Sequence, residues 1–277
     1  MVSAMPPFRL IQISDTHLSR AKPFGVPNFQ AMTAIVAEQK PDLVVNTGDI
    51  AFDGAGSEDD LAFARQCHAA LAVPLRAIPG NHDLGDNPWG GAIEQPITAA
   101  RRERYLRHFG ADWWQQDAAG WSLVGLNAQL FGSGLPAEEA QWSFLAEAVA
   151  ATGRRPLALF IHKPLFNELP DETEVNHRYV NPVHRARLFD ALASVPLRLV
   201  ASGHVHQHRS LRLDRVAYCW GPSTAFTVPD RIQPHIGKKH VGYIAYTFDG
   251  EAVAVDVVEA PALVNHSLDD FPHGYGH

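Results

Sequence analysis

Short clusters of aspartate, asparagine and histidine recur along the chain, and each directly follows an apolar run. The most distinctive is the run Gly80-Asn81-His82-Asp83, which follows the largely apolar run 75–78 with one residue between them. The glycine indicates a sharp turn of the backbone. Because amide, carboxylate and imidazole groups bind metal ions and exchange protons, the pattern predicts a chemical site at this turn.

Four further clusters of the same residue types complete the pattern. They are Asp15-Thr16-His17, Gly48-Asp49, His162 and Gly203-His204-Val205-His206. Their carboxylate oxygens and imidazole nitrogens suit divalent transition metals such as iron, manganese, zinc or cobalt. Two such ions, roughly 3.5–4 Å apart, can share one bridging carboxylate. Asp49 follows a glycine that allows close backbone approach, so we expect it to form that bridge.

Each cluster also has an ordinary structural explanation when it is taken alone. Asp15 could cap a helix, Gly48-Asp49 could form a common turn, and His162 could be a hydrogen-bonded core residue. If residues 204–206 are extended, both of their histidines point to the same face. Five such coincidences at the ends of apolar runs favour the metal site over five separate explanations.

The elements that must position these clusters alternate between strand-like and helix-like segments. The expected strands are 8–13, 42–46, 75–78, 121–126, 157–161 and 197–201, and the expected helices are 29–39, 58–71, 97–109, 136–151 and 183–194. This alternation is typical of layered α/β proteins. Because ligand sites in such proteins form at the carboxyl ends of strands, we expect the five clusters to meet at one rim.

The C-terminal part of the chain has a different pattern. Residues 208–259 read as consecutive antiparallel strands, with a hairpin turn at Asp249-Gly250. We expect these strands to belong to a second sheet within a single domain of residues 1–277. The polar, glycine- and proline-containing residues 265–277 are expected to form a loose tail.

Composition excludes several classes of protein. The 277 residues carry a net charge of −7 and 46% hydrophobic residues, which is typical of a globular protein without a basic field for nucleic acid. Neither a signal peptide nor an apolar run long enough to cross a membrane is expected. The two cysteines, Cys67 and Cys219, are expected to be reduced, which favours a cytoplasmic location. The sequence leaves a homo-oligomer possible.

The order and spacing of the five clusters resemble the motifs of the calcineurin-like metallophosphoesterase family. The resemblance runs from Asp15 to His206 and implies an α/β fold, namely a four-layer αββα sandwich of two mixed β-sheets flanked by helices, with two divalent metals. It implies a first ion held by Asp15, His17, Asp49 and His206. It implies a second ion held by Asp49, Asn81, His162 and His204.

The resemblance also implies a mechanism. His82 would be the catalytic histidine near the leaving group, and Asp83 would orient it, although Asp83 could equally be a plain turn residue. Segments 202–208 and 221–226 resemble the cyclic-nucleotide phosphodiesterase and glycerophosphodiesterase branch. The implied function is hydrolysis of small phosphodiesters by a hydroxide that bridges the two ions.

Two alternatives stay open. One is a phosphomonoesterase or nucleotide pyrophosphatase that uses the same site. The other is a non-catalytic metal-binding scaffold, which would be expected to lack some ligands or the catalytic histidine. Every proposed ligand and His82 are present, so we favour an enzyme.

Further residues are candidates for binding the substrate. Lys163 stands where relatives often carry a second histidine, and it would add a cation beside the phosphate, although it could also point to solvent. Asn87 and Trp89 could line the mouth of the pocket. Segments 166–181 and 222–239 are long and polar and flank the metal-bearing strands, so they are candidates for a lid. Within the lid, His177 would contact the leaving group.

Overall fold

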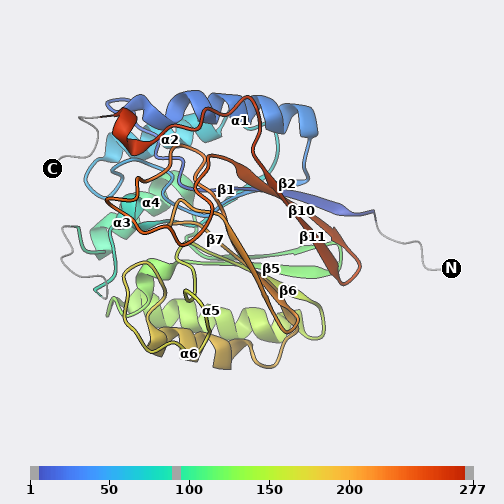
Figure 1. The fold of residues 1–277 in the computed structure, drawn as a ribbon. Helices are drawn as coiled ribbons and strands as arrows, with labels where there is room; N and C mark the ends of the chain where they lie inside the picture. The colour runs from blue at the N-terminus through green and yellow to red at the C-terminus, as the bar shows by residue number, and fades with distance from the viewer. Residues whose placement is uncertain (1–5, 89–94, 272–277) are drawn as a thin grey trace.

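Two β-sheets stack face to face in the computed structural model, which describes residues 6–88 and 95–271 (Figure 1). The first sheet has the order β11-β10-β1-β2-β3, and the second has the order β4-β5-β6-β7-β9-β8. The first comprises β1 (Phe8–Ile13), β2 (Leu43–Asn46), β3 (Leu75–Ala77), β10 (Tyr243–Asp249) and β11 (Ala252–Val258). The second comprises β4 (Trp114–Ala118), β5 (Trp121–Leu126), β6 (Leu157–Ile161), β7 (Leu197–Ser202), β8 (Arg209–Leu213) and β9 (Val216–Trp220).

Helices cover the outer face of each sheet, so the molecule has four layers (Figure 1). The helices are α1 (Val26–Gln39), α2 (Glu58–His68), α3 (Asn81–Leu84), α4 (Ala99–Phe109), α5 (Pro136–Thr152) and α6 (Pro182–Leu192), with short 3-10 turns at Pro23–Gly25, Ala128–Leu130 and Leu268–Asp270. Helices α1, α2 and α4 pack on the first sheet, and α5 and α6 pack on the second. The αββα sandwich of two mixed sheets is therefore confirmed.

Local signals in the sequence explain where several helices begin. The Ser57 side chain accepts a hydrogen bond from the Asp60 N–H, which caps α2. The Asn181 side chain caps α6 in the same way, and Pro182 occupies the first turn, where its missing N–H costs nothing. Helix α5 also begins with a proline, Pro136, as the sequence predicts.

Alternating side chains divide the interior into three apolar cores. On β1, Ile11 and Ile13 face the helices, whereas Leu10 faces the other sheet. On β6, Leu159 packs against α5 and α6, whereas Phe160 packs between the sheets. Strands buried on both faces read as nearly continuous apolar runs, which is why the sequence revealed them.

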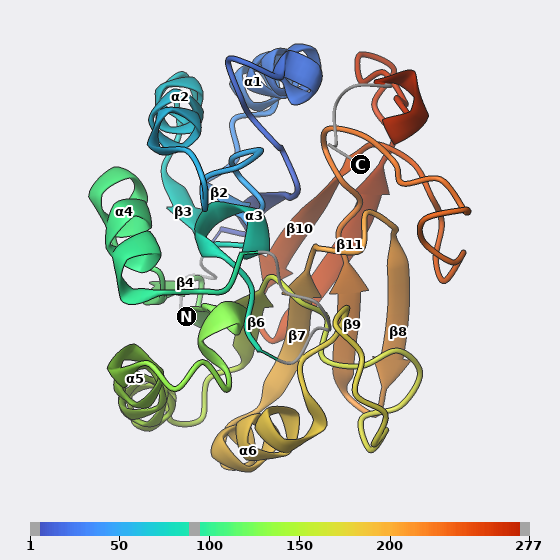
Figure 2. The ribbon, with the colours of Figure 1, turned by 90° about the vertical axis from the view of Figure 1, so that its left-hand side faces the viewer.

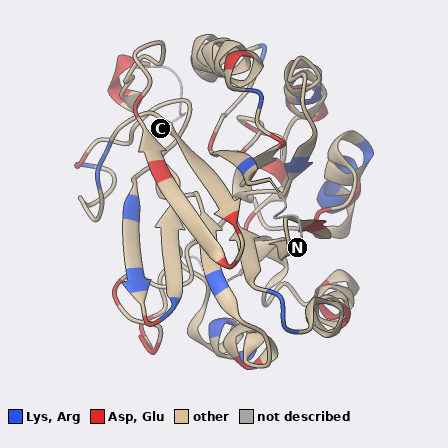
Figure 3. Cartoon of the chain, turned by 90° about the vertical axis from the view of Figure 1, so that its right-hand side faces the viewer, with Lys and Arg blue, Asp and Glu red and all other residues tan. Residues whose placement is uncertain are grey.

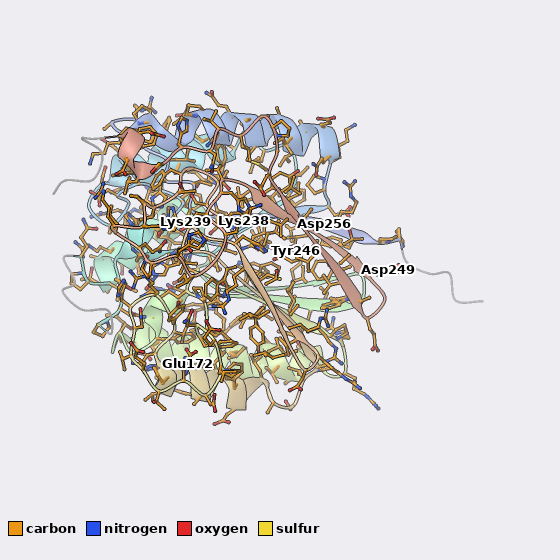
Figure 4. The ribbon with its side chains drawn as sticks, viewed as in Figure 1. Glu172, Lys238, Lys239, Tyr246, Asp249 and Asp256 are labelled. Carbon is orange, nitrogen blue, oxygen red and sulfur yellow. The ribbon has the colours of Figure 1, made fainter. Side chains whose placement is uncertain are left out.

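The prediction that all the C-terminal strands belong to the second sheet is wrong in part. Only β8 and β9 join the second sheet, whereas β10 and β11 add to the first, with β10 antiparallel to β1. The β10–β11 hairpin forms as predicted, and Gly250 adopts the left-handed conformation at its turn. In Figure 4, Asp249 and Asp256 lie along this hairpin. Pairing with β1 supplies the hydrogen-bond partner that β1 would otherwise lack on its outer edge.

The predicted loose tail is ordered over its first part. Thr227 N–H donates to His266 O, and Leu268 N–H donates to Thr227 O, each at 2.8 Å. The Phe271 ring stacks on Phe24 with centroids 4.3 Å apart. These contacts tie residues 265–271 to the body of the protein, while residues 272–277 lie outside the described part.

The sequence also missed β4, because its run WQQDA is too polar to read as a strand.

The carboxyl ends of the parallel strands meet at one end of the sandwich, which faces the viewer in Figure 2. Loops 166–181 and 222–239 lie at this same end in Figures 1 and 2. At the opposite end, drawn in Figure 3, Lys and Arg are interspersed with Asp and Glu and form no basic band. No helix within the described residues is long and apolar enough to cross a lipid bilayer.

One buried histidine makes the stability of this frame depend on pH. His68 Nδ1 lies 2.8 Å from Ala64 O, and its Nε2 lies 3.0 Å from Asn46 Nδ2. Burial lowers the pKa of the ring from 6.5 to about 4. Between these values the unfolded chain binds more protons than the folded chain, so the free energy of unfolding falls as pH decreases.

We expect His68→Gln to remove this pH dependence. Relative to the variant, the wild type should lose about 2 kcal/mol of unfolding free energy between pH 7 and pH 5. Urea unfolding at both pH values measures the difference. His235→Gln, which changes an exposed histidine, serves as the control and should leave the slope unchanged. Equal slopes for the wild type and His68→Gln would contradict the prediction.

Candidate active site

The first group of metal-capable side chains is buried at the carboxyl ends of the strands. It joins Asp15, His17 and His206, whose donor atoms all lie within 4.8 Å of one another. His17 Nε2 lies 3.1 Å from His206 Nε2, and His206 Nε2 lies 3.4 Å from Asp15 Oδ1. Two imidazole nitrogens and a carboxylate oxygen that converge in this way can hold one divalent cation.

The second group contains Asp49, His162 and His204. His162 Nε2 lies 3.4 Å from Asp49 Oδ2 and 3.2 Å from His204 Nδ1. The Asn81 amide oxygen joins this group at 3.3 Å from His162 Nε2. The structure therefore brings all seven predicted ligands to one rim and divides them between two adjacent groups.

Asp49 lies between the two groups. The oxygen that faces His162, Oδ2, also lies 4.0 Å from His17 Nε2 in the first group. Its other oxygen, Oδ1, accepts a hydrogen bond of 2.8 Å from the His82 N–H. One carboxylate is thus held by the backbone on one side and presented to both groups on the other, as a bridging ligand requires.

Backbone carbonyls orient the rings of two ligands. His162 Nδ1 lies 2.8 Å from Thr47 O, and His206 Nδ1 lies 2.8 Å from Phe226 O. Because a carbonyl only accepts hydrogen bonds, each Nδ1 carries a hydrogen and each Nε2 is left to face its group. Sequence reasoning missed these partners, since every residue type offers a carbonyl and only the fold selects one.

Backbone strain is concentrated in this site. Five of the eight described non-glycine residues with positive φ are predicted ligands, namely Asp15, His17, Asp49, His204 and His206, with φ between 42° and 70°. The left-handed region costs energy for residues with a Cβ, and it persists only where the surroundings enforce it. Such strain is concentrated at functional sites in proteins, so its position on the predicted ligands agrees with a functional role.

The expectation that residues 204–206 are extended is wrong. His204 has φ 70°, and the Val205 N–H donates to Gly203 O at 2.8 Å, which closes a three-residue turn of the strained, positive-φ kind. His206 has φ 50°. The two histidines reach different groups because the backbone bends between them, not because strand alternation points both to one face.

Two glycines in the motifs are required by close packing. A Cβ on Gly80 would lie 2.1 Å from Asp49 Oδ1 and 2.7 Å from His162 Cε1. A Cβ on Gly203 would lie 1.8 Å from Ser14 Oγ and 2.7 Å from Asp15 Oδ2. Any side chain at either position would displace a carboxylate ligand, so these glycines allow the motifs to approach one another.

Buried charge in the second group is divided between a carboxylate and an imidazole. Burial lowers the pKa of His162, but the carboxylates of Asp49 and Asp15 outweigh burial and raise it to about 9. Burial raises the pKa of Asp49, but the positive charges of His162 and His82 hold it well below its usual value. A proton on His162 thus supplies, among these side chains, the positive charge that a bound metal cation would otherwise supply.

Two other imidazoles, those of His17 and His204, are held in the neutral form. Burial, together with the positive charge of His82, lowers the pKa of His17 well below 6.5. Burial and the charge of His162 do the same for His204. Neutral imidazoles and ionised carboxylates are the forms that bind metal. The donors, their convergence and their oriented rings therefore fit two divalent cations.

His82 is partly exposed beside the first group. Its ring centroid lies 4.7 Å from that of His17, and its Nδ1 lies 2.7 Å from Phe52 O. The prediction that Asp83 orients His82 is wrong, because the Asp83 carboxylate accepts hydrogen bonds from the N–H groups of Gly80, Ile50 and Ala51 instead. Asp83 shapes the loop, and the Phe52 carbonyl orients the ring.

The predicted substrate-binding residues lie in different environments. Lys163 is buried, with its Nζ 2.6 Å from Asp86 Oδ1 and 3.2 Å from Asn87 Oδ1, so it is not an unpaired cation beside the phosphate site. Burial accordingly lowers the pKa of Lys163, against the opposing effect of Asp86. Asn87 is buried as well, and its Nδ2 donates to Ala128 O. Trp89 lies outside the described residues.

His177 is exposed on loop 166–181, and its positive charge contributes to the lowered pKa of His204. It therefore lies within electrostatic range of the second group. Loop 166–181, which carries Glu172, and loop 222–239, which carries Lys238 and Lys239, are both marked in Figure 4. The loops jointly line a cavity of about 440 Å³.

Comparison with known proteins agrees with this class of fold and site, an αββα sandwich with paired metal-binding groups at one rim. The sequence profile described as calcineurin-like phosphoesterase matches residues 8–208. The chain therefore belongs to the calcineurin-like phosphoesterase family, whose members are metal-dependent hydrolases of phosphate esters.

Relatives of this chain have several activities. It is 29% identical to the 3',5'-cyclic adenosine monophosphate phosphodiesterase CpdA of Pseudomonas aeruginosa, over 78% of this chain and 75% of that one. It is 27% identical to the probable glycerophosphodiester phosphodiesterase GpdQ of Arcobacter nitrofigilis, over 72% and 71%. It is 27% identical to the serine/threonine-protein phosphatase CPPED1 of Danio rerio, over 73% and 71%.

Solved structures share the fold at low sequence identity. A dimetal phosphatase from Danio rerio superposes with a TM-score of 0.62 at 12% identity, over 91% of this chain and 96% of that one. GAP50, described as the anchor in the inner membrane complex of Plasmodium, gives the same TM-score and identity, over 92% and 85%. The likeness establishes the arrangement of sheets and helices.

The division of ligands into two groups predicts which ion each histidine serves. We expect His204→Ala to deplete the ion held with Asn81 and His162, and His206→Ala to deplete the ion held with Asp15 and His17. Metal analysis should give about one ion per chain in each variant, in place of two. Anomalous scattering would show which position is empty, and loss of the same ion in both variants would contradict the division.

Proposed function

We propose that this chain hydrolyses small phosphodiesters of the cyclic-nucleotide or glycerophosphodiester type, with two divalent transition metals. The observation that carries the proposal is the pair of metal-capable groups that share Asp49, with His82 beside His17 at the same rim. Two of the relatives, CpdA and GpdQ, are phosphodiesterases by name, which supports a diester substrate.

The ligand sets follow from the geometry of the groups. The first ion would be held by Asp15, His17, Asp49 and His206, and the second by Asp49, Asn81, His162 and His204. When bound, such ions supply Lewis acidity toward phosphoryl oxygens and an activated water as nucleophile. The oxygen and imidazole donors accept iron, manganese, zinc or cobalt.

In this proposal His82 serves as the general acid. The Phe52 carbonyl accepts from Nδ1–H, so Nε2 is the nitrogen that carries the proton to the departing oxygen. The backbone N–H of the same residue holds Asp49 at 2.8 Å, which fixes the distance between the acid and the metal groups. A proton delivered from this position offsets the charge that develops on the leaving group.

Two loops and the charge of the chain bear on the substrate. Loops 166–181 and 222–239 lie at the same end of the sandwich as the ligand groups, and together they line a cavity of about 440 Å³ that contains none of the proposed ligands. His177 extends from one of these loops and is our candidate for contact with the leaving group. The net charge of −7 argues against nucleic acid as the substrate.

Two other functions compete with this proposal. A phosphomonoesterase on the same site is favoured by the likeness to CPPED1, which is named a protein phosphatase. A non-catalytic scaffold is favoured by the likeness of fold to GAP50, which is described as an anchor. The complete ligand set and the placement of His82 support the enzyme over the scaffold.

A comparison of two reporters tests the proposal. We expect hydrolysis of bis(4-nitrophenyl) phosphate to exceed that of 4-nitrophenyl phosphate in kcat/KM. Prolonged chelation should abolish this activity, and a divalent transition metal should restore it, because every proposed ligand binds such ions. Preference for the monoester would favour the phosphatase. Activity that survives verified metal removal would exclude the metal-dependent mechanism.

Replacement of His82 isolates the proton-transfer step. His82→Ala should lower kcat by roughly 10²–10⁴, the usual range for a positioned general acid. Its metal content should stay at the wild-type value, because the ring is not in either ligand group. Full activity would show that His82 is not the acid. Loss of both ions would show instead that it serves the metal site.

A further inference from the structure

An ion pair between a buried lysine and a partly buried aspartate lies beside the second ligand group. Lys163 follows His162 at the end of β6, and its side chain is 1% exposed. Its Nζ lies 2.6 Å from Asp86 Oδ1 and 3.2 Å from Asn87 Oδ1. The pair therefore joins the strand that carries one ligand, His162, to the segment that follows another, Asn81.

The ion pair continues into a hydrogen-bonded chain that ends at Asn81. In the orientation of the Gln129 amide that satisfies its neighbours, the nitrogen donates to Asp86 Oδ1 at 2.7 Å. The oxygen of the same amide accepts from the Asn81 N–H at 3.1 Å. Gln129 is itself fully buried, and its own N–H donates to Asn127 Oδ1 at 2.9 Å.

Stability alone does not account for this arrangement. Burial of a charged pair costs desolvation energy, and apolar replacements of such pairs are often as stable or more so. What the pair provides is a fixed geometry, because Asp86 Oδ1 receives Lys163 Nζ, Gln129 and the Asn87 N–H together. That geometry is transmitted to Asn81, which supplies a ligand oxygen, and to His82, which follows it.

We propose that Lys163 and Asp86, acting through Gln129, position Asn81 for metal binding in the second group. They are positioning residues that do not touch the substrate, and the role deepens the function proposed above and rests on it. The role of Lys163 as a phosphate-binding cation is replaced, since Asp86 neutralises its charge. Partners of this kind, one step beyond the ligands, typically change metal affinity or activity 10- to 100-fold when removed.

Two variants of the full chain test the proposal. Lys163→Met removes the cation, and Gln129→Met breaks the link to Asn81. In each we expect the affinity for the second ion to fall 10- to 100-fold, and the occupancy of the first group to be retained. Titration with Mn²⁺ or Zn²⁺, followed by metal analysis and anomalous scattering, measures both sites. The fall in kcat should exceed the change in KM, and added metal should restore activity.

The double variant Lys163→Met/Gln129→Met tests whether the two residues act through the same hydrogen-bonded chain or affect the second ion independently. If both residues act through Asn81, the double variant should bind the second ion about as weakly as either single variant. Asn28→Leu is the matched control, since it removes an equally buried amide with three hydrogen bonds, to Ala225 and Val264. It should lower stability and leave both ions bound.

Several outcomes would overturn the proposal. These are wild-type affinity for the second ion in either single variant, equal loss of both ions, and fully additive effects in the double variant. Failure of the proposed function would look different. A wild type without phosphodiesterase activity would remove the reaction, while the metal titrations would still decide whether Lys163 and Gln129 position Asn81.

Discussion

The placement of one carboxylate, Asp49, governs the geometry of the whole site. Its Oδ2 faces both groups of ligands, while its Oδ1 is held by the His82 N–H. Gly80 can carry no side chain because a Cβ there would strike this carboxylate. The two ligand groups and His82 are therefore not three independent features, since His17, His162 and the His82 N–H all lie against the Asp49 carboxylate.

The two sheets form a rigid support for a strained rim. Proposed ligands such as Asp15, His17 and Asp49 hold left-handed backbone conformations that an isolated loop would relax. Strand pairing beneath them and hydrogen bonds between their loops, such as Asp15 N–H to Gly48 O at 2.9 Å, enforce those conformations. The folded sandwich thus offsets the energetic cost of these conformations, which place the donor atoms at angles that relaxed turns do not offer.

Much of this architecture could be predicted from the sequence, and the remainder depends on contacts between distant segments. Buried strands such as β1 and β6 were found because both of their faces are apolar, and Asp15, Asp49 and His162 were found because they follow such runs. The bend at His204 was missed, since its positive φ is imposed by neighbouring loops. Gln129 was missed as well, because an amide between two turns carries no local signal. Likewise, the sheet that β10 joins depends on pairing with β1, more than two hundred residues earlier.

That pairing also determines which segments must be synthesised before the strands beneath the site can pair. Synthesis has delivered every proposed ligand once His206 is made, and the family profile ends at residue 208. Yet β1, which leads into Asp15, receives its antiparallel neighbour only when residues 243–249 have emerged. A chain halted after His206 would contain every proposed ligand side chain, but it would lack the Phe226 carbonyl that orients His206 and the strand that pairs with β1. Residues that follow the motifs are therefore needed to pair β1 and to orient His206.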